Sequence, residues 1–196
     1  MPLPPLRRVV REIARVLAFV LIFASARSTL ADHYKVPSGS MEPTVETGDR
    51  IIVNKAAYGL HVPFTHAIEA RFEGPQLGDV VVLDSPDEDK VLLKRVVATP
   101  GTTIEVRDGH ITIDGTPAPV VDGFEQLGNA HHRVSFANGG GPDFGPMMIP
   151  EDRYLVMGDN RGNSRDGRFF GLVTREAILG HAIAVYWRDG PTWDGL

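Results

Sequence analysis

The chain has 196 residues and no cysteine, which excludes disulfides, thiolate metal sites and a cysteine nucleophile. With 42% hydrophobic and 23% charged residues, it has the composition of a globular protein of one modest domain plus a further segment. Residues 1–31 hold five arginines and one acid, whereas residues 32–196 hold 15 basic and 24 acidic residues. This acidic body argues against nucleic acid as a partner, because binding to phosphates needs clustered lysine and arginine.

The first segment, residues 1–31, joins a basic start to an apolar run. Four arginines precede Val16–Ala26, which carries no charge. A helix over Ile13–Ala31 would be about 28 Å long, close to the ~30 Å hydrocarbon core of a bilayer. We therefore predict a short cytoplasmic tail and a single membrane anchor. Two alternatives remain: a cleaved secretory leader, since Ala24-Ser25-Ala26 resembles an A-x-A cleavage site, and a helix of the protein core.

The remainder, residues 32–196, is predicted to be mainly β. Apolar, β-branched runs separated by glycine and proline predict strands at Arg50–Asn54, Asp79–Leu83, Val91–Ala98, Thr103–Arg107, His110–Asp114, Tyr154–Met157 and Ala182–Trp187. Asp108-Gly109 lies between two of these runs and indicates a two-residue hairpin turn. Thr174–Leu179 predicts a short helix capped by Thr174, and residues 117–150 predict a loop-rich insertion.

A turn with two serine hydroxyls follows the apolar segment. In Val36–Thr44 (VPSGSMEPT), two prolines and a glycine prevent a helix and favour an exposed extended turn. Such a cluster alone is most typical of a linker. The Gly-x-Ser-x-Gly and His-Glu-x-x-His patterns are absent from the sequence, His131-His132 is predicted to be a loop pair, and Asp84–Lys90 a solvated connection.

One lysine interrupts a predicted strand. Lys94 lies in VLLKRVVA, where Leu92 and Val96 share its face. An ammonium among aliphatic neighbours is poorly solvated, so its pKa falls and the amine becomes available as a general base. The alternative is a lysine on an edge strand that faces water and discourages association between sheets.

A polar segment, Gly158–Arg168 (GDNRGNSRDGR), follows the strand YLVM. Its composition fits a hairpin connection, because Gly, Asn and Asp are the usual turn residues. It fits a hydrogen-bonded scaffold equally well.

Taken in order, these segments resemble bacterial type I signal peptidases, the membrane-bound serine–lysine endopeptidases that remove secretory leaders. Four motifs of that family are matched, at Ser38–Thr44, Gly48–Lys55, Lys94–Thr102 and Gly158–Gly171. Arg27 also falls where family members carry an arginine before the nucleophile motif. The likeness runs from about residue 27 to Trp187, except for residues 117–150.

The resemblance implies roles for particular residues. Ser40 would be the nucleophile and Lys94 the general base, with the Ser38 hydroxyl and the Ser40 backbone N–H as the oxyanion hole. Ser164 would orient the lysine amine by a hydrogen bond. Asp166 and Arg168 would pair to brace the loop that carries Ser164, and Gly158 would permit close packing of the backbone. The candidate substrate-binding residues are Val36, Met41 and Leu93.

The resemblance also implies an architecture and partners. We expect a compact antiparallel β-sheet or barrel-like catalytic domain over residues 32–196, with an N-terminal transmembrane helix and a small second lobe. The expected partners are secretory preproteins with A-x-A-like cleavage sites and the lipid bilayer. No cofactor, metal or nucleic acid is implied. The expected location is the plasma (inner) membrane, crossed once, with a cytoplasmic N-terminus and the catalytic domain on the outer side.

Departures from the family pattern occur at Ala98, Thr102, Gly162 and Gly167, which replace glycine, aspartate and two polar residues. They put details of the turn after Lys94 and auxiliary hydrogen bonds in doubt. Two other functions remain open. One is a specialised processing protease of the same chemistry, acting on pilin or conjugation substrates. The other is a non-catalytic, anchored β domain that binds peptides.

Overall fold

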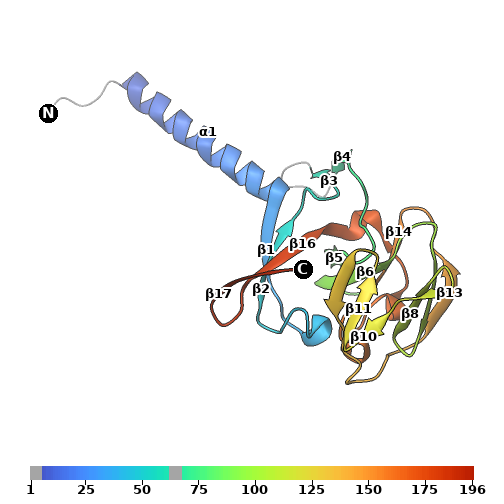
Figure 1. Ribbon diagram of the computed structural model, residues 1–196. Helices are drawn as coiled ribbons and strands as arrows, with labels where there is room; N and C mark the ends of the chain where they lie inside the picture. The colour runs from blue at the N-terminus through green and yellow to red at the C-terminus, as the bar shows by residue number, and fades with distance from the viewer. Residues whose placement is uncertain (1–5, 62–67) are drawn as a thin grey trace.

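The computed structural model describes residues 6–61 and 68–196, so that part of the predicted cytoplasmic tail, residues 1–5, lies outside the described residues. Helix α1 (Leu6–Leu30) begins directly after two prolines and stands away from the β body (Figure 1). Large apolar side chains along it, such as Phe19, are exposed, so the alternative of a core helix is wrong. Within the described residues, no helix combines the length and apolar character needed to cross a bilayer. The anchor stays a prediction.

The largest sheet in the described residues has eight strands, in the order β1-β2-β16-β5-β6-β14-β15, with β17 also paired to β16. Its strands are β1 (Ala31–Lys35), β2 (Arg50–Asn54), β5 (Val80–Asp84), β6 (Val91–Ala98), β14 (Arg153–Met157), β15 (Val173–Thr174), β16 (Ile178–Trp187) and β17 (Pro191–Gly195). Every pairing is antiparallel. The mainly β, antiparallel architecture is therefore confirmed.

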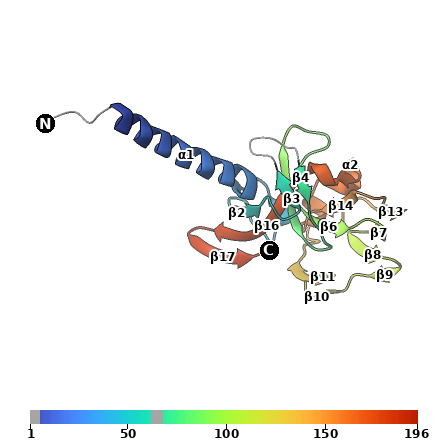
Figure 2. The ribbon, with the colours of Figure 1, turned by 90° about the horizontal axis from the view of Figure 1, so that it is seen from above.

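Three smaller sheets complete the β structure of the described residues. They comprise β3 (Gly59–His61), β4 (Ile68–Arg71), β7 (Thr103–Arg107), β8 (His110–Ile113), β9 (Thr116–Pro117), β10 (Val120–Val121), β11 (Phe124–Leu127), β12 (Ala130–Arg133) and β13 (Phe144–Met148). The sheets β13-β7-β8-β9 and β10-β11-β12 form a second lobe, on the side of the body away from α1 (Figures 1 and 2). Single helical turns lie at η1 (Gly39–Met41), η2 (Arg161–Asn163), α2 (Gly167–Phe170) and η3 (Arg175–Ala177).

The predicted strands are confirmed, with ends that differ by a residue or a few. The hairpin turn is confirmed too, because Asp108 and Gly109 both have positive φ, 45° and 77°. Residues 117–150 are not only loop, since they contain β10 to β13. The helix over Thr174–Leu179 is wrong: only η3 is helical, and the following residues pair with β5 in β16. Thr174 nevertheless caps η3, accepting the Ala177 N–H at 3.2 Å.

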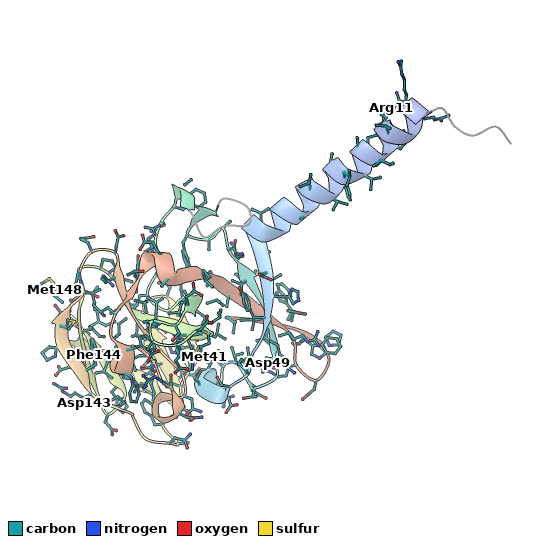
Figure 3. All side chains as sticks on the ribbon, turned by 180° about the vertical axis from the view of Figure 1, so that it is seen from behind. Arg11, Met41, Asp49, Asp143, Phe144 and Met148 are labelled. Atoms are coloured by element: carbon teal, nitrogen blue, oxygen red, sulfur yellow. The ribbon has the colours of Figure 1, made fainter. Side chains whose placement is uncertain are left out.

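Two apolar clusters flank the strand that carries Lys94. One contains Val36, Met41 and Val82 and fixes the turn after β1 against the large sheet. The other contains Val97, Leu155 and Met157 and joins β6 and β14 to the second lobe. Figure 3 shows Met41 between the two lobes, with Phe144 and Met148 at the far side of the second lobe. The site described next therefore lies where the two lobes meet.

Candidate active site

The turn that carries Ser40 is held from both sides. At its base, the Val36 N–H donates to Asp49 O and the Gly48 N–H donates to Val36 O, each at 2.8 Å. The Met41 side chain is fully buried in the apolar cluster of the large sheet. These contacts fix the backbone on which the half-buried Ser40 side chain stands.

Lys94 lies on β6, where it pairs with Val81 of β5, and the pairing of β6 with β14 begins at the next residue, Arg95. The alternative of a lysine that faces water is wrong, because the side chain is buried. Only 3% of Lys94 is exposed, and its Nζ donates hydrogen bonds to Ser40 Oγ at 2.7 Å and to Leu93 O at 2.9 Å. Burial lowers the pKa of this amine from 10.5 to about 8. The structure thus brings the predicted nucleophile and base together, 54 residues apart in the chain.

The loop after β14 is braced by an ion pair. Asp166 Oδ2 accepts the Gly158 N–H at 3.0 Å and Arg168 Nη2 at 2.8 Å. Arg168 also donates to Arg161 O at 2.7 Å, which ties η2 to α2. A Cβ on Gly158 would collide with Ser164 Oγ and Ser40 O, so glycine is required where this loop meets the serine turn.

Ser164 is buried beside this contact, but its hydroxyl has no hydrogen-bond partner in the described residues. The predicted hydrogen bond from Ser164 to the Lys94 amine is therefore not made in this structure. The two hydrogen bonds of the amine go to Ser40 and to the backbone of Leu93 instead.

A groove of about 290 Å³ opens beside the Ser40–Lys94 pair. All three predicted substrate-binding residues, Val36, Met41 and Leu93, line it, and so does Ser38. The sequence reasoning missed Tyr34, which precedes Val36 by two residues; strand alternation places both on one face. The groove is thus mostly apolar, with the hydrogen-bonded Ser40 hydroxyl and Lys94 amine in its wall.

The departures from the family pattern have local explanations. The Thr102 hydroxyl donates to Thr99 O at 2.7 Å and closes the turn after β6, while Ala98 is fully buried. Gly162 lies against the backbone of Asn138, where a Cβ would collide. A Cβ on Gly167 would come within 2.9 Å of Val156 O. Both glycines therefore permit close backbone contacts around the polar loop.

A buried ion pair that sequence reasoning missed joins β6 to the polar loop. Arg95 Nε and Nη2 donate to Asp159 at 2.9 and 2.8 Å, and Thr44 Oγ1 donates to Asp159 Oδ2 at 2.6 Å. Burial alone would raise the pKa of Asp159, but Arg95, His132 and Thr44 together outweigh burial, and the pKa is lowered. The carboxylate is therefore charged at neutral pH. No group of histidines and carboxylates in the described ranges is arranged to hold a metal ion.

Known proteins resemble this chain over most of its length. The family described as "Signal peptidase, peptidase S26" matches residues 8–187. The chain is 35% identical to the signal peptidase I of Pseudomonas aeruginosa, over 89% of this chain and 70% of that protein. It is 32% identical to the signal peptidase I of Leptolyngbya laminosa, over 86% and 74%, and 33% identical to the signal peptidase I P of Bacillus subtilis subsp. natto, over 89% and 86%.

A solved signal peptidase I from Enterococcus faecalis is 27% identical and aligns with a TM-score of 0.43, covering 56% of this chain and 97% of that one. The sequence matches define the protein as a serine endopeptidase, which favours an enzyme over a non-catalytic peptide-binding domain. The chain belongs to the signal peptidase family, peptidase S26, and is an enzyme of the signal peptidase I type.

Proposed function

We propose that this enzyme removes N-terminal signal peptides from secretory preproteins, with Ser40 as the nucleophile and Lys94 as the general base. The observation that carries the proposal is the 2.7 Å contact between Lys94 Nζ and Ser40 Oγ in a buried setting. An amine with a pKa of about 8 is partly neutral at physiological pH. The neutral form has a lone pair that accepts the serine proton.

In the first step the Lys94 amine takes the proton of Ser40 as Oγ attacks the scissile carbonyl carbon. The negative charge passes to the carbonyl oxygen, where the Ser40 backbone N–H and the Ser38 hydroxyl donate hydrogen bonds. One such donor typically contributes about 3–4 kcal/mol to the transition state. The ammonium then gives its proton to the leaving amine as the C–N bond breaks. Water attacks the resulting ester, with Lys94 again as the base, and releases the serine.

The groove supports an extended substrate. β14 pairs with β6 only over Arg95–Ala98, so within the described part of the chain the edge of β6 at residues 91–94 has no strand partner on that side. A peptide laid along this edge would add a strand, and its alternate side chains would enter the groove between Val36 and Leu93. The modest volume of the groove favours small side chains, and hence A-x-A-like cleavage sites.

The residues predicted to support the catalytic pair all lie in the loop after β14. Asp166 and Arg168 hold the segment from Gly158 to α2, and Gly158 lets that segment touch the Ser40 carbonyl. Ser164 would turn its free hydroxyl to the Lys94 amine once the substrate is bound. Such a contact would direct the amine lone pair at Ser40.

The membrane belongs to the same proposal. Helix α1 carries arginines at its start and exposed apolar residues over Val16–Leu21, and it leads directly into β1. In a cell this helix would anchor the enzyme once in the plasma membrane, with its basic end in the cytoplasm. Residues 32–196 would then form the catalytic domain on the outer side.

The test is cleavage of a leader-bearing preprotein in detergent, read by mass spectrometry of both products. Ser40→Ala and Lys94→Ala should each abolish cleavage while the circular dichroism of the chain stays unchanged. Lys55→Ala, at a lysine that does not line the groove, is the control and should cleave normally. Cleavage by either dyad variant would refute the mechanism.

A further inference from the structure

A buried histidine in the second lobe has no part in the proposed chemistry. His132 was expected in a loop, but it lies on β12 and is 6% exposed, whereas its neighbour His131 is exposed. Its Nε2 lies 3.3 Å from Glu125 Oε2 and 3.8 Å from Asp159 Oδ1. Neither ring nitrogen makes a hydrogen bond within the described residues. The buried ring therefore brings one nitrogen, Nε2, to ion-pair distance of two carboxylates.

We infer that His132 is a positioning residue for the Ser40–Lys94 pair and that it acts through Asp159. This inference rests on the proposed function. Asp159 is the carboxylate that binds Arg95, the residue after the base, and Thr44, four residues after the nucleophile. One carboxylate thus sets the separation of the strand that carries Lys94 and the turn that carries Ser40.

The residue after Asp159 reaches the nucleophile itself. The Asn160 N–H donates to Ser40 O at 3.1 Å, and its side-chain amide donates to Gly39 O at 3.1 Å. A displacement of Asp159 is therefore passed through one peptide unit to the carbonyl of the reacting serine. Misplacement of reacting groups by about 1 Å costs up to ~100-fold in rate.

Glu125, the second carboxylate beside His132, is held in place by its own ion pair. Its side chain is fully buried and paired with Arg161, which donates to Oε1 at 3.0 Å and also to Oε2. Burial raises the pKa of Glu125, but His132 and Arg161 outweigh it and the pKa is lowered. Glu125 and Asp159 are thus both charged, and both lie close to the same nitrogen, His132 Nε2, at 3.3 and 3.8 Å. Like charges repel strongly in a protein interior, and an N–H between them lowers this repulsion.

The nitrogen, rather than the ring, is the feature that matters. His132→Gln keeps an N–H donor near the position of Nε2, and His132→Phe keeps the ring but has no donor. Against a leader-bearing preprotein, the Phe variant should show kcat lowered about tenfold with KM within about twofold, since the groove is untouched. The Gln variant should keep at least half of kcat. His131→Phe, at an exposed ring stacked on Phe124, should match the wild type.

A second readout needs no turnover. The amide of Asn160 should exchange its hydrogen faster in His132→Phe than in the wild type or in His132→Gln, because its bond to Ser40 O is loosened. If the Phe variant does not fold, His132→Asn replaces it, because its shorter side chain places the amide away from one carboxylate. It should show the same faster exchange and lower kcat.

The outcomes separate the two proposals. Equal kcat and equal Asn160 exchange in the wild type and the variant without the donor would overturn the role of His132. Equal losses in the Phe and Gln variants would also overturn it, since ring packing would then be the cause. Failure of the wild type to cleave preproteins, with Asn160 exchange changed as expected, would refute only the proposed function.

Discussion

The buried amine of Lys94 destabilises the fold, and replacing it should stabilise the protein while ending its activity. Lowering the pKa from 10.5 to about 8 corresponds to about 3 kcal/mol, since each pH unit of difference is worth about 1.4 kcal/mol. Lys94→Met keeps a flexible chain of similar length without a charge. It should raise the free energy of unfolding at pH 7 by up to about 3 kcal/mol, less the contribution of the two lost hydrogen bonds.

The sign of this effect fixes its pH dependence. Above pH 10.5 the amine is neutral in the folded and the unfolded chain, so it costs nothing. As the pH falls from 10.5 to about 8, the unfolded chain takes up a proton that the folded chain does not, and folding loses stability. Below about pH 8 both states are protonated and the loss is constant. The advantage of Lys94→Met should therefore be full at pH 7 and vanish near pH 10.5.

The assay is urea unfolding of the full chain in detergent, followed by tryptophan fluorescence at both pH values. Lys90→Met is the control, because Lys90 lines the same groove but is about half exposed. Its free energy of unfolding should stay within about 0.5 kcal/mol of the wild type. A Lys94→Met variant no more stable than the wild type at pH 7, or equally stabilised at pH 10.5, would refute the reasoning.

Three further outcomes are expected. The kcat/KM for preprotein cleavage should rise with pH through about 8 and then level, and Lys94→Arg should be inactive because a guanidinium stays protonated; a rise near 10.5 would contradict the burial of the amine. Thr44→Val should destabilise the fold by about 1–2 kcal/mol in thermal unfolding, since Asp159 loses one hydrogen bond; an unchanged Tm would count against it. Arg165→Ala should raise KM about twofold at low salt only, because its exposed pair with Asp87 ties down the loop beside the groove; a change that persists at high salt would exclude this cause.

The strands of the large sheet could be predicted because their local pattern and their environment agree. β5 (VVVL) and β6 (VLLKRVVA) are β-branched runs bounded by turn residues, and both became inner strands. The turn at Asp108-Gly109 was predictable because few residue pairs accept positive φ at both positions.

The second lobe could not be predicted in the same way. β10 has only two residues and β13 contains Gly145 and Pro146, so neither shows an apolar alternation. They are strands because β11 and β7 offer partners, which is a tertiary effect. The same effect overrode the helical pattern after Thr174, where Ile178 pairs with Leu83 of β5.

The catalytic pair was predictable from motifs, but its supports were not. Ser40 and Lys94 stand in recognisable segments, whereas Glu125 and His132 lie in a stretch without a pattern. Asp159 and Arg95 stand within matched motifs, yet nothing local says that they pair across 64 residues. Polar contacts between distant segments depend on the fold that brings them together. The hydrogen bond from Ser164 to the Lys94 amine was expected from the motif, yet the folded chain does not make it.

Lys94 and Arg95 are adjacent basic residues of β6 with different electrostatic surroundings. Arg95 forms an ion pair with Asp159, whereas Lys94 has no carboxylate at ion-pair distance among residues 6–61 and 68–196, and burial lowers the pKa of its amine. Exchanging the two would set a permanent charge against Ser40 and would replace the two-point guanidinium contact to Asp159 by a single ammonium. The order lysine–arginine therefore matters at both positions.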